Sequence, residues 1–275
     1  MPATRLLPLS ERPILRVDPA GGGERFLVVA DLHLGLGAVE GWAEGPPEAA
    51  PMAMADELLR ATEETRSRRI IFAGDVKHPI VGTPRPLRPV VFDFFSELLR
   101  AGVAVDVVLG NHDVGLEPAL PKEVRVHPSG GLVRAGIGIF HGHRWPSARL
   151  LAQPRLVAGH LHPGFRFAPS ADDAGAKRRC WVRTRFPPRP PKVGRRRRRR
   201  FAATELVVLP AFHPLAGTEA LNRSRPSRGR SFLFARFLAV GESRLYLMDG
   251  TDLGPLTVPP RPVRPKARAA APPDR

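Results

Sequence analysis

The chain has 275 residues, of which 43 are basic and 26 are acidic, giving a formal net charge of +17. Its apolar share of 43% is ordinary for a globular protein, and no apolar run approaches the roughly 18 residues that span a bilayer. One cysteine, Cys180, excludes an intrachain disulfide, and the first residues lack the pattern of a secretory signal. Membrane-spanning and disulfide-stabilised classes are thus excluded, and we expect a cytoplasmic protein.

The positive charge is concentrated in one segment. Residues 1–162 contain 18 basic and 18 acidic residues, whereas residues 163–231 contain 18 basic and 4 acidic ones. Within that segment Arg195–Arg200 are six consecutive arginines. Such a segment fits a polyanionic partner, of which nucleic acid is the commonest. The alternative is a solvated loop whose arginines reflect the composition of a GC-rich genome.

Strand and helix patterns alternate through the first half of the chain. The apolar run Phe26–Ala30 predicts a buried strand, and the amphipathic stretch Met52–Arg69 predicts a helix. A strand at Ile70–Ala73, a helix near Val90–Ala101 and a strand at Val103–Leu109 follow. This alternation predicts βαβ units and a largely parallel, buried sheet.

The second half has shorter predicted strands separated by Gly and Pro, which indicates a more antiparallel sheet. These strands are Val124–His127, Leu132–Arg134, Ile137–Phe140, Leu156–Ala158, Trp181–Phe186, Glu205–Leu209, Phe232–Leu238 and Arg244–Met248. We expect one domain over residues 1–255, with basic exposed loops at 187–200 and 222–230. Residues 256–275, rich in Pro, Ala and Arg, are predicted to be a disordered tail.

Metal-binding residue types directly follow five of the predicted strands. They are Asp31 and His33, then Asp75, then Asn111, His112 and Asp113, then His141 and His143, and finally His160 and His162. Ligands of open α/β sheets bind at the carboxyl ends of the strands, so these side chains are expected at one edge. Mixed oxygen and nitrogen ligands suit Mn, Fe or Zn, and there are enough for two ions that share a carboxylate.

A single cluster taken alone could also be structural. In Gly110–Asp113, for example, Asn and Asp are residues that favour a tight turn. Six of the nine histidines nevertheless fall in the clusters, which favours a metal centre. His127 and His213 lie outside the set and are interpreted as structural, while His143 fits either the site or a turn. No P-loop, Rossmann fingerprint or serine nucleophile elbow occurs.

The order of the clusters resembles the five motifs of the calcineurin-like metallophosphoesterases. The matching strings are Asp31-x-His33, Gly74-Asp75, Gly110-Asn111-His112-Asp113, His141-Gly142 and Gly159-His160-x-His162. Gly74–His78, Leu209–Phe212 and Asp249–Gly254 make the chain similar to an archaeal group related to the SbcD repair nucleases. The resemblance covers about residues 10–255 and implies an α/β fold, a four-layer αββα sandwich of two β-sheets flanked by helices.

The resemblance also implies an enzyme, a phosphoesterase that cleaves phosphate esters, above all phosphodiesters of nucleic acid or nucleotides, through a hydroxide bridging two ions. Asp31, His33, Asp75 and His162 would hold one ion, and Asp75, Asn111, His141 and His160 the other. Mn²⁺ is favoured, with Fe, Zn or Ni as alternatives. His112 would be the general acid with Asp113 orienting its ring, and His78 an accessory active-site histidine.

Some features depart from the family's pattern. His213 stands where members carry Asn, the run Arg195–Arg200 is additional, and most DNA- and partner-binding segments of the repair nucleases are missing. A second hypothesis is therefore a catalytically weak scaffold of the same fold that binds nucleic acid or protein. Such scaffolds usually lose a ligand or the catalytic histidine, and this chain keeps His112 and every expected ligand.

Overall fold

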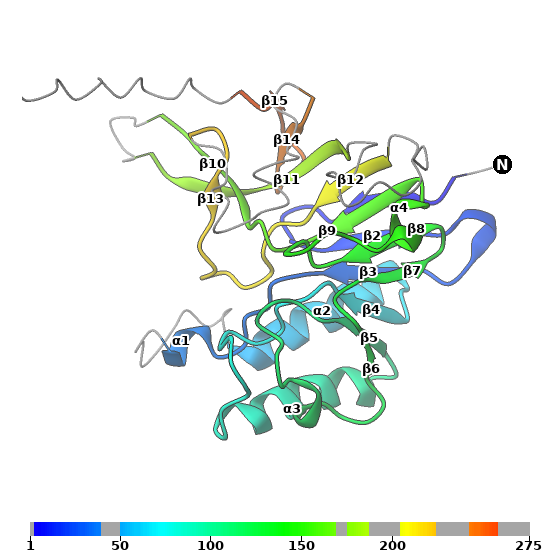
Figure 1. Ribbon diagram of the computed structural model, residues 1–275, viewed down its shortest axis with the longest axis vertical. Helices are drawn as coiled ribbons and strands as arrows, with labels where there is room; N and C mark the ends of the chain where they lie inside the picture. Colours follow the sequence, from blue (N-terminus) through cyan, green and yellow to red (C-terminus); the bar gives the residue numbers. More distant parts are fainter. Residues whose placement is uncertain (1–2, 40–49, 169–174, 187–203, 224–241, 258–275) are drawn as a thin grey trace, which may run out of the picture.

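The computed structural model describes residues 3–39, 50–168, 175–186, 204–223 and 242–257, and its strands form two stacked β-sheets (Figure 1). The predicted basic loop at 187–200, residues 224–230 of the second basic loop, the predicted strand Phe232–Leu238 and residues 258–275 of the predicted tail lie outside the described residues. Among the helices that are described, none is both long and apolar enough to cross a membrane.

The first sheet has six strands in chain order. They are β1 (Arg5–Pro8), β2 (Leu15–Asp18), β3 (Phe26–Val29), β4 (Arg69–Phe72), β5 (Ala104–Val108) and β6 (Arg125–His127). Strands β3 to β6 pair in parallel, as the βαβ pattern predicted, whereas β1 and β2 form an antiparallel extension beside β3. The sequence did not predict β1 or β2.

Two crossover helices, α2 (Pro51–Thr65) and α3 (Leu87–Arg100), cover one face of the first sheet (Figure 1). The predicted first helix was too long at its C-terminal end. Arg66 adopts a left-handed conformation (φ 54°, ψ 39°), and the N–H groups of Arg66 and Ser67 donate to carbonyls of the last helical turn. This C-cap ends α2, so Arg69 belongs to β4 instead.

The second sheet is mixed, with more antiparallel than parallel strand pairs, as the sequence predicted. Its strands are β7 (Leu132–Arg134), β8 (Ile137–Phe140), β9 (Arg155–Ala158), β10 (Pro163–Arg166), β11 (Lys177–Phe186), β12 (Thr204–Val208), β13 (Glu219–Ala220), β14 (Arg244–Leu247) and β15 (Asp252–Pro255). Strand β9 pairs in parallel with β8 and β12, and helix α4 (Ala148–Leu151) connects β8 to β9. The short helices η1 (Ala20–Gly22), α1 (Leu36–Val39) and η3 (Glu117–Ala119) lie in connections of the first half.

Alternation of side chains along the strands produces three apolar layers. On β3, Leu27 and Val29 pack toward α2 and α3, whereas Val28 packs in the layer between the sheets. On β9, Val157 joins that middle layer, and Leu156 packs outward with α4. The expected sandwich of two sheets is confirmed. Among the described residues, the helix that packs on the outer face of the second sheet is α4, which is a single turn.

Candidate metal centre

The predicted ligands lie together where the strands of both sheets end. Asp31 and His33 follow β3, Asp75 follows β4, Asn111 and His112 follow β5, His141 follows β8, and His160 and His162 follow β9. Backbone hydrogen bonds join these loops: the N–H of Asp31 donates to Gly74 O (3.0 Å), and that of His33 to Asp75 O (2.9 Å). The N–H of His160 donates to the Asp31 carboxylate (3.0 Å), which ties the second sheet to the first.

One cluster consists of Asp31, His33 and His162, whose ligand atoms lie within 4.8 Å of one another. The Nε2 atoms of His33 and His162 are 3.2 Å apart, and Nε2 of His162 is 3.3 Å from Asp31 Oδ1. Two imidazole nitrogens can approach so closely only with a proton or a cation between them. Nδ1 of His162 donates to Gly217 O (3.0 Å), which directs Nε2 into the cluster. The donor set therefore fits a divalent metal.

The second cluster consists of Asp75, His141 and His160, also within 4.8 Å. Nε2 of His141 lies 3.1 Å from Asp75 Oδ2 and 3.2 Å from Asn111 Oδ1, so the predicted amide ligand joins the cluster. Nδ1 of His141 donates to Ala73 O (2.9 Å), and this bond again directs Nε2 toward the other donors. A carboxylate, an amide oxygen and two imidazoles suit Mn, Fe or Zn.

Asp75 lies between the two clusters. Its Oδ2 atom is 3.1 Å from Nε2 of His141 in the second cluster and 4.0 Å from Nε2 of His33 in the first. The carboxylate is almost completely buried, at 2% exposure. One carboxylate within reach of both donor sets is the arrangement that a bridging ligand of two metal ions requires.

Five of these residues adopt the left-handed backbone conformation that non-glycine residues avoid. Their φ angles are 60° for Asp31, 46° for His33, 53° for Asp75, 69° for His160 and 46° for His162. Each such residue costs roughly 1 kcal/mol or more, a cost that proteins tolerate mainly at functional sites. Five of the candidate ligands share this conformation, whereas elsewhere in the described chain it occurs at Glu11, Arg66 and Ala135 among the non-glycine residues.

Glycines beside the ligands allow the loops to approach closely. A Cβ added at Gly110 would lie 2.2 Å from Asp75 Oδ1, and one at Gly159 would lie 2.8 Å from Asp31 Oδ2. At Gly74, where φ is +90°, a Cβ would lie 2.5 Å from the ring of His141. A methyl group at any of these positions would displace a predicted ligand.

We expect Gly110→Ala to weaken Mn²⁺ binding by about 100-fold or more, because the new methyl group must move the Asp75 carboxylate. Isothermal titration calorimetry of wild type and variant measures this effect. Gly37→Ala is the matched control, since a Cβ there meets no atom of the described residues within 4 Å. Equal affinity of Gly110→Ala and Gly37→Ala would contradict the packing described here.

Buried charges in the two clusters hold one another in defined protonation states. Burial opposes ionisation of Asp31 and Asp75, yet the facing imidazoles hold the pKa of both carboxyl groups below their usual range. Burial also disfavours the imidazolium of His141, but the adjacent Asp75 carboxylate raises its pKa to about 9. Burial lowers the pKa of His33 to about 3 and that of His160 to about 4. The imidazoles of His33 and His160 are thus neutral and ready to bind a metal at neutral pH.

The raised pKa of His141 predicts a pH-dependent metal affinity. Below about pH 9 the metal-free protein carries a proton on this ring, and a metal ion must displace it. Mn²⁺ affinity should therefore rise with pH, by up to about tenfold per unit, and level off above about pH 9. Calorimetry in buffers of different ionisation enthalpy counts the protons released, and an affinity that is flat between about pH 7 and 9 would contradict the prediction.

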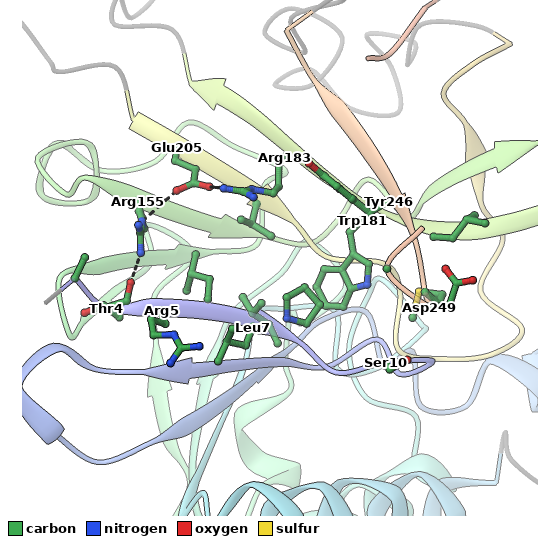
Figure 2. Close-up of a pocket in the computed structure, with 18 residues that line it drawn as sticks. Thr4, Arg5, Leu7, Ser10, Arg155, Trp181, Arg183, Glu205, Tyr246 and Asp249 are labelled. Carbon is green, nitrogen blue, oxygen red and sulfur yellow. Dashed lines mark hydrogen bonds and ion pairs between the residues drawn. The ribbon is translucent and has the colours of Figure 1, made fainter. Parts of the chain in front are cut away.

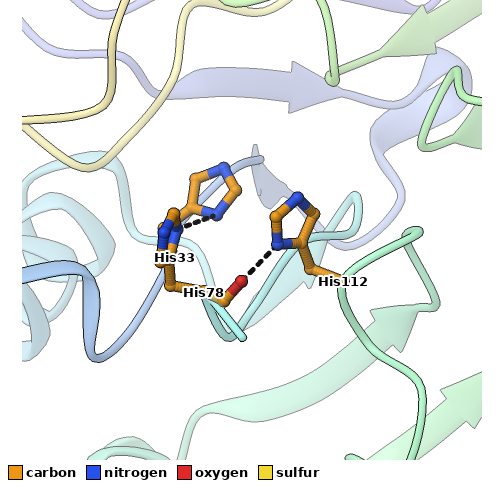
Figure 3. A group of neighbouring side chains, drawn as sticks. All are labelled: His33, His78 and His112. Atoms are coloured by element: carbon orange, nitrogen blue, oxygen red, sulfur yellow. Dashed lines mark hydrogen bonds between the residues drawn. The ribbon is translucent and has the colours of Figure 1, made fainter. Parts of the chain in front are cut away.

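The ring of His112 is held beside the metal clusters by the neighbouring loop. Its Nδ1 donates to the backbone carbonyl of His78, and its Nε2 lies 3.8 Å from Asp75 Oδ2. Figure 3 shows the rings of His33, His78 and His112 around one small space, with Nδ1 of His78 lying 3.4 Å from Nδ1 of His33. The hydrogen bond through Nδ1 leaves Nε2 of His112 as the atom that faces the centre.

The predicted role of Asp113 as the group that orients the His112 ring needs correction. Its Oδ1 accepts from the N–H groups of Val76 (2.9 Å) and Lys77 (3.4 Å), and its Oδ2 accepts from that of Gly110 (2.8 Å). The carboxylate therefore joins the loops that follow β4 and β5. The His78 carbonyl takes the orienting position instead, because a backbone acceptor already occupies Nδ1 of His112.

Lys77 was not predicted as a site residue, but its side chain is fully buried beside the centre. The ammonium group donates to the backbone carbonyls of Pro79 and His112, and burial lowers its pKa. It thereby links the loop that carries His78 to the loop that carries Asn111 and His112. In the sequence Lys77 is an ordinary polar residue of a loop, with no pattern that would indicate burial.

The remaining histidines separate into structural and neighbouring ones. His127 pairs through Nε2 with Asp106 Oδ1 (2.7 Å), and Asp106 also accepts from Arg69, which confirms the structural interpretation of His127. His213 is buried and accepts the N–H of Leu215 at Nδ1 (3.1 Å), as expected of a turn residue. The ring of His143 lies 5.3 Å from that of His141, so His143 borders the second cluster.

Comparison with known proteins gives a match of structure but not of sequence. Neither a family model nor a curated protein sequence matched the chain. A nuclease from Pseudomonas putida, nuclease MPE, is 20% identical with a TM-score of 0.55, and the match covers 90% of this chain and all of that one. This likeness shows that the two chains share a fold. YfcE, a phosphoesterase from E. coli, is 18% identical with a TM-score of 0.33, over 53% of this chain and 74% of its own. Membership of the SbcD-related group stays a prediction.

Proposed function

We propose that the chain is a two-metal phosphoesterase that hydrolyses phosphodiesters of nucleic acid or nucleotides. The observation that carries the proposal is the position of Asp75, a buried carboxylate within reach of two separate Asp–His clusters. Asp31, His33, Asp75 and His162 would hold one ion, and Asp75, Asn111, His141 and His160 the other. Two ions bound in this way activate water and neutralise charge on a phosphate.

The protein's own groups supply orientation and proton transfer. The carbonyls of Ala73 and Gly217 hold His141 and His162 with Nε2 toward the centre. His112, held through Nδ1, presents Nε2 at 3.8 Å from Asp75 and would give a proton to the leaving oxygen. His78, in contact with His33, would border the phosphate as an accessory residue.

The scaffold alternative is less well supported. A binding scaffold has no need for eight buried or half-buried polar side chains in a small volume, because their burial and backbone strain are destabilising. Asn111, His112 and the residues of both clusters converge on one point, and His112 keeps a free ring nitrogen. These features favour turnover over simple binding.

A basic pair of strands begins directly after His162 and supports a nucleic-acid substrate. Strand β10 begins at Pro163, immediately after His162, and pairs with β11 so that Arg166 lies opposite Lys177. Arg166, Lys177 and Arg178 are all exposed. Positive side chains next to a metal centre bind the phosphates that flank a scissile bond.

Neutralising this pair of strands should weaken nucleic-acid binding in a salt-dependent way. We expect Arg166→Gln combined with Lys177→Gln, a directly opposed pair on one face of the sheet, to lower the affinity for single-stranded DNA, and to reduce the slope of log K against log salt by about 0.7 per lost contact. Fluorescence anisotropy over a salt series measures both. Arg100→Gln, at the far end of α3, removes an exposed charge away from this pair of strands. If Arg100→Gln and the double variant bind alike, the pair of strands is not the interface.

The proposal is tested by a hydrolysis assay. Purified protein with Mn²⁺ is incubated with bis-p-nitrophenyl phosphate, p-nitrophenyl phosphate, cyclic nucleotides and single-stranded DNA, each with and without a chelator. We expect Mn²⁺-dependent cleavage that is faster on the diesters than on the monoester. An absence of hydrolysis of every substrate would leave the scaffold alternative as the better account.

A further inference from the structure

A cavity of about 540 Å³ lies at the edge of the first sheet, away from the metal centre (Figure 2). It is bordered by β1 on one side and by β11, β12 and β14 on the other, and we call it the edge pocket. None of the predicted metal ligands, nor His78, His112 or Asp113, lines it. Its volume falls in the range of small-molecule sites.

Most of the pocket wall is apolar and continuous with the layer between the sheets. Leu15, Trp181 and Val207 belong to that layer, and the partly buried Tyr246 packs against it. Leu7 of β1 forms part of the opposite wall. Such a lining favours a ligand with an apolar or aromatic body.

Trp181 forms the aromatic part of the pocket wall. Trp181 is buried, at 2% exposure, yet its indole Nε1 has no acceptor within the described residues. Figure 2 shows the indole at the pocket wall with its nitrogen turned toward the Asp249 end. The indole nitrogen itself has almost no exposed surface, so Trp181 offers the pocket an aromatic wall rather than a donor.

One end of the pocket carries an excess of positive charge. Glu205 accepts from Nε of Arg183 (3.0 Å) and lies 3.1 Å from Nε of Arg155, so two guanidinium groups share one carboxylate (Figure 2). Arg155 and Glu205 lie at the starts of β9 and β12, whereas the ligands His160 and His162 follow the end of β9. The charged end can therefore bind an anionic group without taking part in the metal centre.

We propose that the edge pocket binds a small amphipathic anion. Its apolar or aromatic body lies against Trp181 and Leu7, and its single anionic group faces Arg183 and Arg155. This site is independent of the proposed phosphoesterase activity, since it shares no residue with the metal centre.

The proposal is tested with two probes that differ by one charge. Dansylglycine has a naphthalene body, sulfonyl acceptors and a carboxylate, whereas dansylamide lacks the carboxylate. Dansyl fluorescence, which rises in apolar surroundings, is titrated against the full chain. We expect saturable one-to-one binding of both probes, with dansylglycine bound about tenfold more tightly because its carboxylate makes a charge-assisted hydrogen bond.

Matched variants assign the binding to named side chains. Leu7→Trp should abolish binding of both probes by filling the pocket, and Arg183→Gln should remove the preference for dansylglycine. Arg185→Gln, two residues along β11 and outside the lining, should leave both affinities unchanged. Thermal melting and Mn²⁺ binding confirm that each variant is folded.

Three results would overturn the proposal. They are an absence of saturable binding to the wild type, equal affinity for the two probes, and dansylglycine binding that persists in folded Leu7→Trp. If Leu7→Trp fails to fold, Arg183→Gln decides, because retained preference for dansylglycine in that variant also overturns it.

Discussion

Asp75→Asn should lower phosphodiester hydrolysis by about 1000-fold, which corresponds to about 4 kcal/mol of transition-state stabilisation. Asn retains the shape of Asp75 but removes the charge that lies 3.1 Å from His141 and 4.0 Å from His33. Both donor sets would lose their shared carboxylate. We therefore expect weaker binding of both ions together with the loss of activity, measured by calorimetry and by cleavage of bis-p-nitrophenyl phosphate.

Asp106→Asn is the matched control for this prediction. Asp106 is also a buried carboxylate, but it pairs with Arg69 and His127 away from the centre. The control should lose some stability to urea while keeping metal affinity and specific activity. If Asp75→Asn kept full activity, Asp75 would not bridge two ions, and the site assignment would be wrong.

His112→Ala should leave metal binding intact and lower the rate by an amount that depends on the leaving group. General acid catalysis contributes roughly 10²- to 10⁴-fold when the leaving oxygen is a strong base. We expect about a 100-fold loss with single-stranded DNA, whose leaving group is an alkoxide. With bis-p-nitrophenyl phosphate, whose leaving group needs little protonation, the loss should be less than about tenfold.

His127→Ala serves as the control, because its ring contacts Asp106 rather than the centre. This variant should keep the wild-type rate on both substrates. Equal losses in His112→Ala on the two substrates would instead assign His112 to binding or positioning of the phosphate.

The convergence of the candidate metal ligands at one edge could be predicted from the sequence because each one closely follows an apolar strand. Asp31, Asp75 and Asn111 need no long-range information beyond the rule that parallel strands end at one edge. The sheet pairing of β3, β4 and β5 was predictable for the same reason. Strands β1 and β2 escaped prediction because charged residues or proline interrupt their apolar residues, whereas β3 is a continuous apolar run.

Contacts between side chains and distant backbone groups could not be predicted. Nothing in the order of residues shows that Lys77 donates to the carbonyl of His112, or that Asp113 accepts three backbone N–H groups. These bonds exist because the loops after β4 and β5 lie side by side in the folded chain. The end of α2 could not be predicted for a different, local reason. Its C-cap is formed by Arg66 in the left-handed conformation, where Gly is the usual residue.

The central claim is that two metal ions share Asp75 at the ends of the strands. Crystals of the full chain grown with Mn²⁺ would test it most directly, through anomalous scattering measured at the manganese absorption edge. If two ions share Asp75, two anomalous peaks should appear on either side of it, one beside Asp31, His33 and His162 and the other beside Asn111, His141 and His160. A single peak, or peaks away from these residues, would contradict it.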